Sequence, residues 1–533
     1  MLMRAVTAER ETPEALPQTL PGLVDLRAGA PGDAVVFPGE RATYPEFREA
    51  TLEMARRLHG AGVRRGDRVG LLMNASLDAF ALQVGAMRIG AVPVPVNARF
   101  KALELAYVIR HSGMHLLVAE PLYAEVLREA GAADLCRVVI GTQEPDFAAG
   151  AAGVGDDAVL AIQAELDGDA DGLMLYTSGT TAHPKGCVHR HSAIIAEGDR
   201  IAERLGLGQG DRFWTPLPFF HVGSIAILAG ALVAQAASLQ MAHFEPGAAL
   251  DQLEEERCTV AFPAFETIWL GVLNHPRFPT ADLSRIRLVI AVGVPPSLVA
   301  MQERFPTASL ISCFGSTETC AFACLGEARF SLEERSTIIG MPLRDIEIRT
   351  IDPETGEDAG VGVPGELIMR GPTRFMRYHD DPEQTALTID EDGWYHSGDL
   401  GRLDEVGRVS FVGRLKDMLK VGGENVAAAE VEAFLVTHAA CEIVQVVGAP
   451  DSRYTEVAAA FVQLRAGATA TEQELIDHCR GQIATFKVPR YVRFVDQWPM
   501  SGTKIQKFKL REQITSELEA AGITEAPRIT SGR

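Results

Sequence analysis

Between residues 192 and 313, apolar strand-like runs alternate with segments of helical periodicity, and this rhythm constrains the fold more than any other feature of the sequence. Helices are expected at 192–205, 224–235, 247–257, 266–274 and 296–305, and strands at 212–216, 238–242, 259–262, 287–291 and 309–313. Strands that are separated by helices pair in parallel, and the helices cover both faces of the sheet. The predicted fold class is therefore α/β, with layered parallel sheets in a large N-terminal domain.

Two later regions follow other patterns. Short strands with tight turns between Gly340 and Arg414 predict a small β subdomain. After Arg414 the helices and strands mix in a compact pattern, which predicts a small α+β C-terminal domain. Residues 1–40 contain little periodic pattern, so we expect them to form a loosely held lead-in.

The charge of the chain restricts its partners and its location. A formal net charge of −21 argues against nucleic acid and anionic membrane surfaces as partners. The start, Met1 to Arg4, lacks the apolar core of a signal peptide. The uncharged run Ile225–Leu239 is shorter than the roughly 18–20 residues that cross a bilayer, so we expect a buried helix there. Eight scattered cysteines are expected to be reduced thiols, which agrees with a cytoplasmic protein without integral membrane association.

Several polar and aromatic residues stand where predicted strands end. Ligands of parallel sheets bind outside the carboxyl ends of the strands. We therefore expect these residues to converge on one crevice: Tyr176, His221, Phe265, Gly293 and Phe314.

The segment Tyr176–Gly186 reads Y-T-S-G-T-T-A-H-P-K-G and has the composition of a phosphate-binding loop. Hydroxyl groups, a flexible glycine and a late cation can surround phosphoryl oxygens with donors. The residues concerned are Thr177, Ser178, Gly179, Thr180, Thr181 and Lys185. The P-loop order G-x-x-x-x-G-K-[ST] is absent, which argues against a P-loop nucleotidase. The alternative reading is a surface loop rich in Ser, Thr and Gly.

This segment resembles the signature loop of the adenylate-forming superfamily, which comprises acyl-CoA synthetases, luciferases and peptide-synthetase adenylation domains. Further motifs follow in family order, and the resemblance extends from about Tyr44 to Leu510. Phe314–Glu318 resembles the Y-G-x-T-E motif, with Phe in place of Tyr. The resemblance implies that Phe314 stacks on adenine, that Thr317 contacts the α-phosphate and that Glu318 binds Mg²⁺, an ion that prefers carboxylate and phosphate oxygens.

Two motifs resemble the part of the family site that holds the ribose and joins the domains. Asp399, in the sequence S-G-D, is implied to accept hydrogen bonds from both ribose hydroxyls. Gly413–Val426 resembles the segment where the family chain crosses between domains and swivels, so Arg414 would contact ribose or phosphate and Lys416 would be the hinge. This divides the chain into domains 1–415 and 416–533, the second of them mobile. Gly422 and Gly423 would lie against the pantetheine arm of CoA.

Near the end of the chain, Trp498–Lys507 resembles the family segment that carries the mobile catalytic lysine. Lys504 is the implied residue, although the segment is one residue shorter than the pattern and Thr503 stands where the family has glycine. A shift in register would assign the role to Lys507 or Lys509 instead. His221 matches the family's gate to the acyl pocket, while the alternative for a lone histidine is a packed or capping residue.

The resemblance implies an acid:CoA ligase that uses ATP, Mg²⁺ and CoA, and forms acyl-AMP and then acyl-CoA. The expected pocket contains no Arg or Lys that could pair with a second carboxylate, which indicates an apolar acyl, alicyclic or aryl monocarboxylic acid. Its positions are His221, Val222, Ser224, Ile225, Phe265, Val292, Gly293, Cys320, Ala321 and Phe322. Four alternatives stay open: a peptide-synthetase adenylation domain, an acyl-AMP ligase that serves a carrier protein, a luciferase-like oxygenase and a non-enzymatic nucleotide-binding protein. A homodimer is compatible with the sequence.

Overall fold

The alternating segment forms one sheet of seven strands. The strand order is β13 (Ser309–Ile311), β12 (Leu288–Val292), β11 (Val260–Phe265), β9 (Arg212–Thr215), β10 (Ala237–Gln240), β1 (Asp33–Phe37) and β2 (Glu40–Thr43). Neighbouring strands are parallel except β1 and β2. The structure is a computed structural model that describes residues 15–177, 184–501 and 504–529, and it confirms the predicted parallel sheet and the α/β class.

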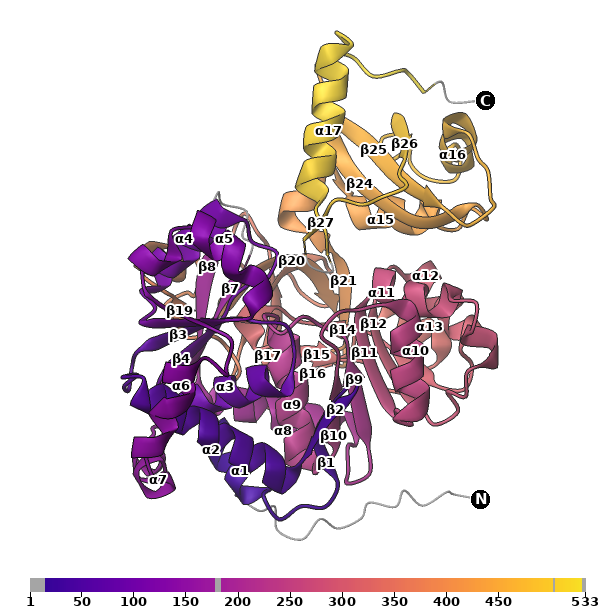
Figure 1. Ribbon diagram of the computed structural model, residues 1–533. Helices are drawn as coiled ribbons and strands as arrows, with labels where there is room; N and C mark the ends of the chain where they lie inside the picture. The colour runs from indigo at the N-terminus through magenta and orange to yellow at the C-terminus, as the bar shows by residue number, and fades with distance from the viewer. Residues whose placement is uncertain (1–14, 178–183, 502–503, 530–533) are drawn as a thin grey trace, which may run out of the picture.

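Helices cover both faces of this sheet (Figure 1). They are α8 (His191–Leu205), α9 (Val222–Ala234), α10 (Pro246–Glu255), α11 (Glu266–Asn274) and α12 (Pro295–Arg304). Two adjacent residues of β9 point to opposite faces of the sheet. Phe213 packs in the core that contains α8 and α9, whereas Trp214 packs in the core that contains α10, α11 and α12. Helix α9 is buried from Val222 to Leu232, as predicted for this uncharged run. No helix within the described ranges has both the length and the apolar character to cross a membrane.

A second parallel sheet lies beside the first. Its order is β4 (Val92–Pro95), β3 (Arg68–Leu72), β5 (Leu116–Ala119) and β6 (Arg137–Ile140), and its helices are α2 (Tyr44–Gly60), α3 (Leu77–Arg88), α4 (Ala102–Ser112) and α5 (Ala124–Glu129). Two parallel sheets in one body agree with the layered arrangement that the sequence predicts.

The expectation for residues 1–40 is wrong over the part that the structure describes. Helix α1 (Leu20–Leu26) and strand β1 contribute fully buried side chains to the main core, among them Leu20, Leu23 and Val35. Strand β1 pairs in parallel with β10, a strand that follows about 200 residues later. Local periodicity does not detect this pairing because the partner is so distant in sequence.

The segment that carries the phosphate-loop pattern joins two antiparallel strands. Strand β7 (Asp171–Thr177) pairs with β8 (Lys185–Arg190), and β8 pairs with β19 (Arg377–Tyr378). The sequence indicates the first strand but not β8. Tyr176 therefore lies inside a strand of a small antiparallel sheet and does not follow a strand of the main parallel sheet.

The predicted β subdomain consists of antiparallel strands. One sheet has the order β17 (Glu347–Ile351), β18 (Gly365–Arg370), β20 (Tyr395–Leu403) and β21 (Val409–Arg414), and another has the order β14 (Cys313–Phe314), β15 (Cys324–Leu325) and β16 (Met341–Pro342). Strand β20 is absent from the sequence-based expectation, and it places Asp399 directly opposite Arg414 of β21.

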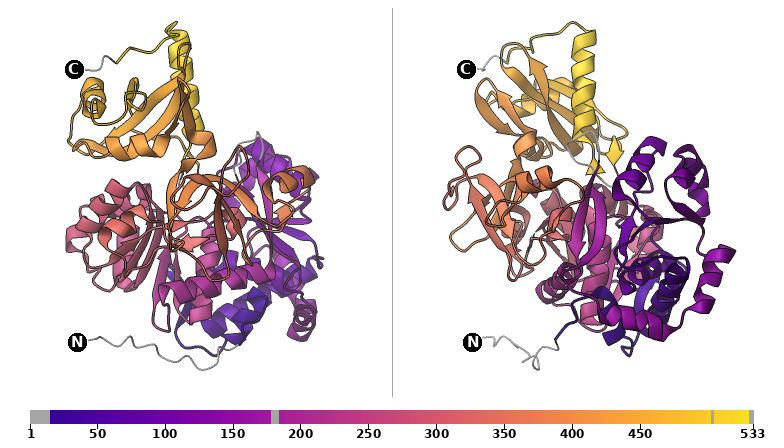
Figure 2. Two further views of the ribbon diagram at one scale, coloured as in Figure 1. Left: turned by 180° about the vertical axis from the view of Figure 1, so that it is seen from behind. Right: turned by 90° about the vertical axis from the view of Figure 1, so that its left-hand side faces the viewer.

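The C-terminal domain lies above the body (Figure 1) and is built on a five-stranded sheet. Its strands are β22 (Met418–Val421), β23 (Glu424–Ala427), β24 (Cys441–Asp451), β25 (Thr455–Leu464) and β26 (Tyr491–Phe494), and its helices are α15 (Ala428–Leu435), α16 (Glu472–Cys479) and α17 (Lys507–Ala520). A hairpin of β27 (Met500–Ser501) and β28 (Lys504–Ile505) extends from this domain toward the body (Figure 2). The short turn η6 (Leu415–Asp417) joins the two parts, and the division at 415 and 416 stays a prediction.

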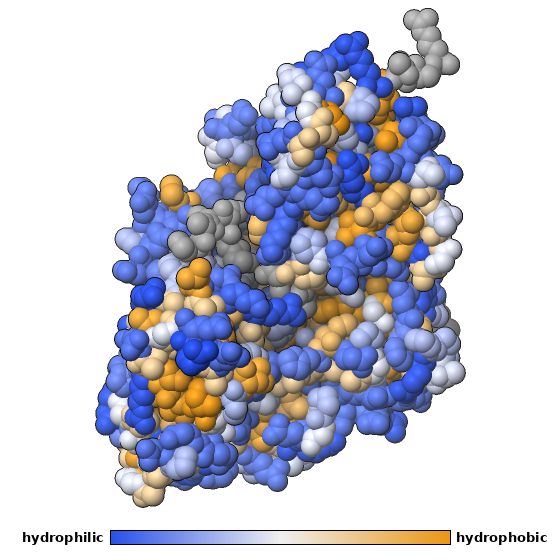
Figure 3. Space-filling model, turned by 45° about the horizontal axis from the view of Figure 1, so that its top comes forward, coloured by the Kyte–Doolittle hydropathy of each residue, from blue (hydrophilic) through white to orange (hydrophobic). Residues whose placement is uncertain are grey.

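The remaining elements are short or peripheral. They are α6 (Pro145–Ala149), α7 (Asp156–Ala164), α13 (Leu332–Thr337), α14 (Pro382–Thr388), η1 (Pro121–Tyr123), η2 (Ala132–Asp134), η3 (Gly150–Gly153), η4 (Phe278–Thr280) and η5 (Thr317–Thr319). All eight cysteines are free and seven are buried, in agreement with the expected reduced thiols. Figure 3 shows mostly polar residues on this face, with apolar residues in several separate patches.

Candidate active site

Lys504 brings a charge from the C-terminal domain to the body. Its Nζ lies 5.4 Å from the centroid of the Phe265 ring, at the end of β11. Lys504 is accessible to solvent, yet the protein atoms around its ammonium group displace water and lower its pKa. Arg414 also lowers this pKa, whereas Glu318 and Asp399 raise it. One ammonium group is thus close to both carboxylates of the predicted nucleotide site.

The two alternative lysines are placed differently. The Nζ of Lys507 donates to Oε1 of Glu432, within the C-terminal domain, at 2.5 Å. Lys509 is exposed on α17. The shortened segment therefore directs Lys504, and not its neighbours, toward Glu318 and Asp399. The catalytic role of Lys504 stays a prediction.

Asp399 lies between cations on the β20–β21 pair. Its Oδ1 is 3.2 Å from Nε of Arg414, and the residue is only 9% exposed. Burial raises the pKa of Asp399, while the charges of Arg414, Lys504 and Lys416 oppose that rise. The Ser397 hydroxyl accepts the Asp399 N–H at 3.0 Å and donates to the Leu367 carbonyl at 2.6 Å, which fixes the turn before the carboxylate. Such a held acceptor suits two ribose hydroxyls.

Glu318 is positioned in η5, directly after the Phe314 strand β14. The Tyr378 hydroxyl donates to its Oε1 at 2.8 Å, and its backbone carbonyl accepts the Phe375 N–H at 2.7 Å. Lys185 lies over the same Tyr378 ring, with Nζ 5.2 Å from the centroid. The tyrosine thus connects Lys185, at the end of the phosphate-loop segment, to the predicted metal ligand.

The residues present fit a magnesium ion that is held mainly by nucleotide phosphates. Within the described ranges, no group of three His, Cys, Asp or Glu residues gathers to bind a metal by itself. Mg²⁺ commonly uses one or two carboxylates and completes its shell with phosphate oxygens and water. Glu318 can supply such a carboxylate, since only its Oε1 is engaged by Tyr378.

Phe314 has an aromatic partner that the sequence reasoning missed. Its ring centroid is 6.3 Å from that of Phe411 on β21, with an interplanar angle of 36°. Phe411 is 43% exposed and stands three residues before Arg414. An exposed aromatic residue beside a nucleotide-site motif is the signal that would have identified it. The stacking of Phe314 on adenine stays a prediction.

The expected acyl pocket is mostly apolar where the structure describes it. His221 stands at the N-cap position of α9, and burial together with the charges of Lys504 and Arg99 lowers its pKa to about 3. The imidazole is therefore neutral near pH 7. The Ser224 hydroxyl is turned to the core, where it donates to Gln240 Oε1 at 3.3 Å. Phe265 and Val292 are paired at the ends of adjacent strands, next to Gly293.

One wall of this pocket has an unusual backbone. Cys320 and Ala321 have φ values of 62° and 118°, in a region that residues with a Cβ seldom adopt. The next residue, Phe322, donates its N–H to Oε1 of the fully buried Glu197 at 2.8 Å. Burial raises the pKa of Glu197 well above its usual value, so this side chain is a neutral acid. Sequence reasoning missed Glu197, which directly follows the apolar residues 193–196 of α8.

The other predicted residues are placed as follows. Thr177 ends β7 opposite Lys185, and Thr317 begins η5. Ser178, Gly179, Thr180 and Thr181 lie outside the described residues. Lys416 lies in η6 between the domains. Gly422 and Gly423 form the β22–β23 turn with φ values of 61° and 92°, and the contacts of Gly422 are with Tyr454 of the C-terminal domain.

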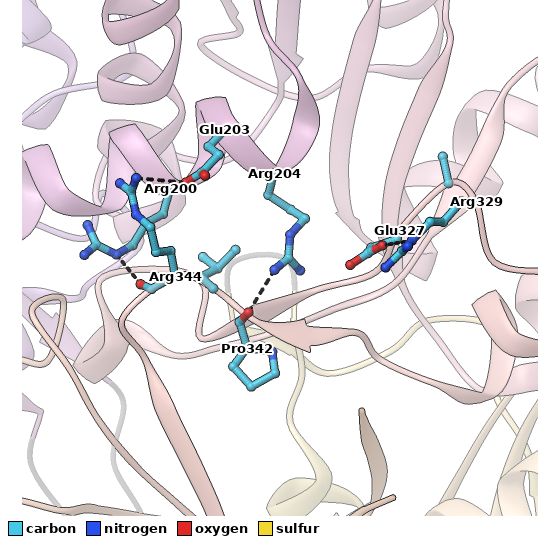
Figure 4. Close-up of a pocket in the computed structure, with 9 residues that line it drawn as sticks. Arg200, Glu203, Arg204, Glu327, Arg329, Pro342 and Arg344 are labelled. Atoms are coloured by element: carbon cyan, nitrogen blue, oxygen red, sulfur yellow. Dashed lines mark hydrogen bonds and ion pairs between the residues drawn. The ribbon is translucent and has the colours of Figure 1, made fainter. Parts of the chain in front are cut away.

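A separate cavity of about 460 Å³ lies against α8 (Figure 4), and Lys504 is not among the residues that line it. It is lined by Arg200, Glu203, Arg204, Glu327, Ala328, Arg329, Pro342, Leu343 and Arg344. Arg204 donates to the carbonyls of Leu325, Met341 and Pro342, and Arg344 pairs with Glu203 at 3.3 Å. These arginines tie α8 to the β16 region, so the cavity is explained by structure and not by catalysis.

The comparisons with known proteins agree with this geometry. Residues 27–379 match the family described as AMP-binding enzyme, and residues 430–504 match the AMP-binding enzyme C-terminal domain. The chain is 35% identical over 519 residues to the putative acyl-CoA synthetase YngI of Bacillus subtilis (strain 168), which covers 90% of this chain and 94% of the relative. It is 30% identical over 523 residues to the mitochondrial medium-chain acyl-CoA ligase ACSF2 of Rattus norvegicus, with coverages of 91% and 85%.

A solved structure is similar to this chain over nearly its whole length. The crystal structure of ATP-bound MatB from Rhodopseudomonas palustris matches with a TM-score of 0.84 at 26% identity, and covers 93% of this chain and 98% of that chain. The two family matches fall in the body and in the C-terminal domain, which together provide the candidate site. The chain belongs to the AMP-binding enzymes and is an AMP-forming acyl-CoA synthetase.

Proposed function

We propose that this synthetase activates an apolar monocarboxylic acid, first as the acyl-AMP and then as the CoA thioester. The observation that carries the proposal is the position of Lys504, whose ammonium group is near Phe265 on the acyl side and near Glu318 and Asp399 on the nucleotide side. A cation at this junction can neutralise the charge that builds up when a carboxylate approaches a phosphate.

In the first half-reaction, a carboxylate oxygen attacks the α-phosphorus of ATP and pyrophosphate leaves. Asp399 holds the ribose hydroxyls, Phe314 and Phe411 supply aromatic surface for the adenine, and Lys504 holds the reacting oxygens together. Mg²⁺, bound through Glu318 and phosphate oxygens, would neutralise the triphosphate charge. The neutral His221 adds no charge to the acyl entrance near pH 7, so the positive charge near it comes from Lys504 and Arg99.

In the second half-reaction, the CoA thiolate attacks the carbonyl carbon of the acyl-AMP and AMP leaves. We infer that rotation at Lys416 removes Lys504 and brings the Gly422–Gly423 turn to the pantetheine arm. Support comes from the positive φ values of that turn, which bring backbone close to a ligand without a side chain. The family relation supports CoA as the acceptor over a carrier protein or the oxygen of a luciferase.

The acid is inferred from the lining of the pocket. Val222, Ile225 and Phe322 are buried apolar residues, and the Ser224 hydroxyl is already hydrogen-bonded to Gln240. No Arg or Lys stands among the expected pocket positions to pair with a second carboxylate. The relative named as a medium-chain acyl-CoA ligase makes a medium-chain fatty acid the first choice, with aryl and alicyclic acids next.

The experiment is a panel of acids assayed for pyrophosphate release and for AMP formation with and without CoA. Octanoate should give both products, with AMP turnover dependent on CoA, while malonate should give neither. Rapid turnover of malonate would contradict the apolar pocket. Pyrophosphate release without CoA-dependent turnover would favour the acyl-AMP ligase. Loss of all turnover on removal of Mg²⁺, with recovery on its return, would support the Mg²⁺ requirement, and a higher Mg²⁺ concentration for half-maximal rate in Glu318→Gln would support the metal role of Glu318.

The proposal also includes the compartment and the oligomeric state of the protein. Eight free thiols are typical of a reducing compartment, which supports the cytoplasm. A homodimer is retained as a hypothesis that sedimentation velocity would test, and the two half-reactions need residues of only one chain.

A further inference from the structure

Glu266 lies where the two domains meet. It begins α11 and directly follows Phe265, whose ring lies beneath the Lys504 ammonium group. Its carboxyl group is close enough to Glu432 and Glu442 of the C-terminal domain to experience both charges. On the body side, a Cβ added at Gly293 would be 4.0 Å from Cδ of Glu266. The half-buried side chain thus lies near both domains, one residue from the acyl site.

Its neighbour Glu432 anchors the end of the Lys504 hairpin. Glu432 is 6% exposed, and its Oε1 accepts the Val446 N–H at 2.7 Å and Nζ of Lys507 at 2.5 Å. Lys507 begins α17 and follows Lys504 by three residues. The Glu432–Lys507 pair therefore helps to determine where the Lys504 hairpin stands relative to the body.

Glu266 brings a second carboxyl group to this pair without a cation of its own. Its Oε1 is buried and has no hydrogen-bond partner within the described ranges. Burial raises the pKa of Glu266 to about 7; the Ser297 hydroxyl opposes the rise, Glu432 and Glu442 add to it, and Arg465 opposes it. The charged groups around this contact are Glu432 on α15, Glu442 on β24, Arg465 after β25, Lys507 on α17 and Arg304 on α12.

We propose that Glu266 is a positioning residue for the C-terminal domain. When Glu266 is protonated, the domain can place Lys504 for adenylation. When Glu266 is ionised, it repels Glu432 and favours rotation of the domain toward the thioester-forming orientation. This inference rests on the proposed function. Glu266 acts through Glu432 and Lys507 and touches neither ATP nor the acid. The protonation of Glu266, and with it the repulsion that Glu432 experiences across the interface, is what this inference makes dependent on pH.

The direction of the pH effect follows from the two orientations. When the C-terminal domain turns away, Glu432 and Glu442 leave and Glu266 meets water, where a glutamate titrates near about pH 4.3. The orientation described here binds the proton more tightly, so protonation favours it most fully below about pH 4.3. This advantage is lost as the pH rises to about 7 and changes little above that. His221, with a pKa of about 3, does not titrate in the upper part of this range.

The test measures the two half-reactions separately from about pH 5.5 to about pH 8, with octanoate for adenylation and supplied octanoyl-AMP for CoA transfer. Wild-type single-turnover pyrophosphate release should fall about tenfold between pH 5.5 and pH 7. CoA transfer is compared between enzymes at each pH, because rising pH also ionises the CoA thiol. Glu266→Gln, neutral at every pH, should remove that fall. The control Glu430→Gln changes an exposed glutamate of α15, which pairs with Lys487 and stands two residues before Glu432, and should keep the wild-type profile. A Glu266→Gln enzyme with the wild-type profile, or an equal change in both half-reactions, would overturn the inference.

A second measurement separates this inference from the proposed function. Spin labels at the exposed residues Val363 and Ile523, one in each domain, report the domain orientation with ATP present and without turnover. The fraction in the Lys504-seated orientation should fall between pH 5.5 and pH 7 in wild type and stay constant in Glu266→Gln. A wild-type fraction that does not change with pH would refute the role of Glu266 even if every acid is activated. Absence of acid activation together with the expected distances would refute only the proposed function.

Discussion

The body and the C-terminal domain contribute to the candidate site in different ways. Asp399 and Glu318 belong to the body, and strand pairing, the Ser397 hydroxyl and the Tyr378 hydroxyl fix their positions. Lys504 belongs to the C-terminal domain and reaches the site on a hairpin of two short strands. The body thus provides a fixed binding surface, and the C-terminal domain provides the Lys504 charge, which can move away with the domain. Loss of Lys504 should therefore affect one half-reaction, whereas a substitution in the binding surface of the body should weaken nucleotide binding in both.

The largest effect is expected for Lys504→Ala. Loss of the ammonium group should slow adenylation by about a hundredfold to a thousandfold, the range found when a group that stabilises a transition state is removed. Transfer from supplied acyl-AMP to CoA should survive, since Lys504 has then turned away. Rapid-quench pyrophosphate release measures the first effect. Lys509→Ala, on the exposed surface of α17, is the control. Loss of adenylation in Lys509→Ala, with normal adenylation in Lys504→Ala, would show that the register is shifted.

Asp399→Ala should produce the next largest effect. Hydrogen bonds to charged groups contribute about 1.5–3 kcal/mol each, so kcat/KM for ATP should fall at least about tenfold. Unlike Lys504→Ala, this change should also weaken AMP binding, which calorimetry measures directly. Asp392→Ala changes an exposed aspartate in the turn before β20 and should leave ATP kinetics intact. Normal AMP affinity in Asp399→Ala would show that Asp399 does not bind the nucleotide.

Lys416→Pro addresses the junction between the two parts. Proline fixes φ, so the rotation should be impaired, and CoA transfer should slow about tenfold while adenylation is largely retained. Lys416→Ala removes the charge but keeps the rotation and should transfer at a near-normal rate. If both variants lose both half-reactions equally, η6 is not the hinge.

The smallest effect is expected for Glu197. Glu197→Leu leaves the Phe322 N–H without its acceptor in the core, which costs about 1–3 kcal/mol and loosens the wall that contains Cys320 and Ala321. The KM for the acid should rise a few fold while the KM for ATP stays constant. Glu197→Gln keeps a neutral acceptor and should resemble wild type in both KM values and in urea unfolding. An equal rise in both KM values would indicate general loosening of the body.

The sequence predicts the parts of this molecule in which local pattern and motif agree. The alternation from 192 to 313 predicts the main sheet because each helix and strand carries its own periodicity, and the Phe314–Glu318 and Ser397–Asp399 motifs locate two carboxylates that meet Lys504 in space. Strand β8 was missed because it follows the phosphate-loop pattern within a hairpin. Glu197 and Glu266 were missed for a different reason, since their environments come from Phe322, Glu432 and Glu442, residues distant in sequence.

Strand β1 has a consequence for the synthesis of this protein. Its parallel partner β10 leaves the ribosome about 200 residues later, and chains grow at about 5–20 residues per second. For roughly ten to forty seconds the apolar β1 segment therefore lacks its parallel partner and can pair with β2, which emerges directly after it. Helices α2 and α3, which pack beside β1 in the same core, emerge much sooner and can shelter it during that interval. The edge of the main sheet that contains the earliest residues is thus completed only after the middle of the chain has been made.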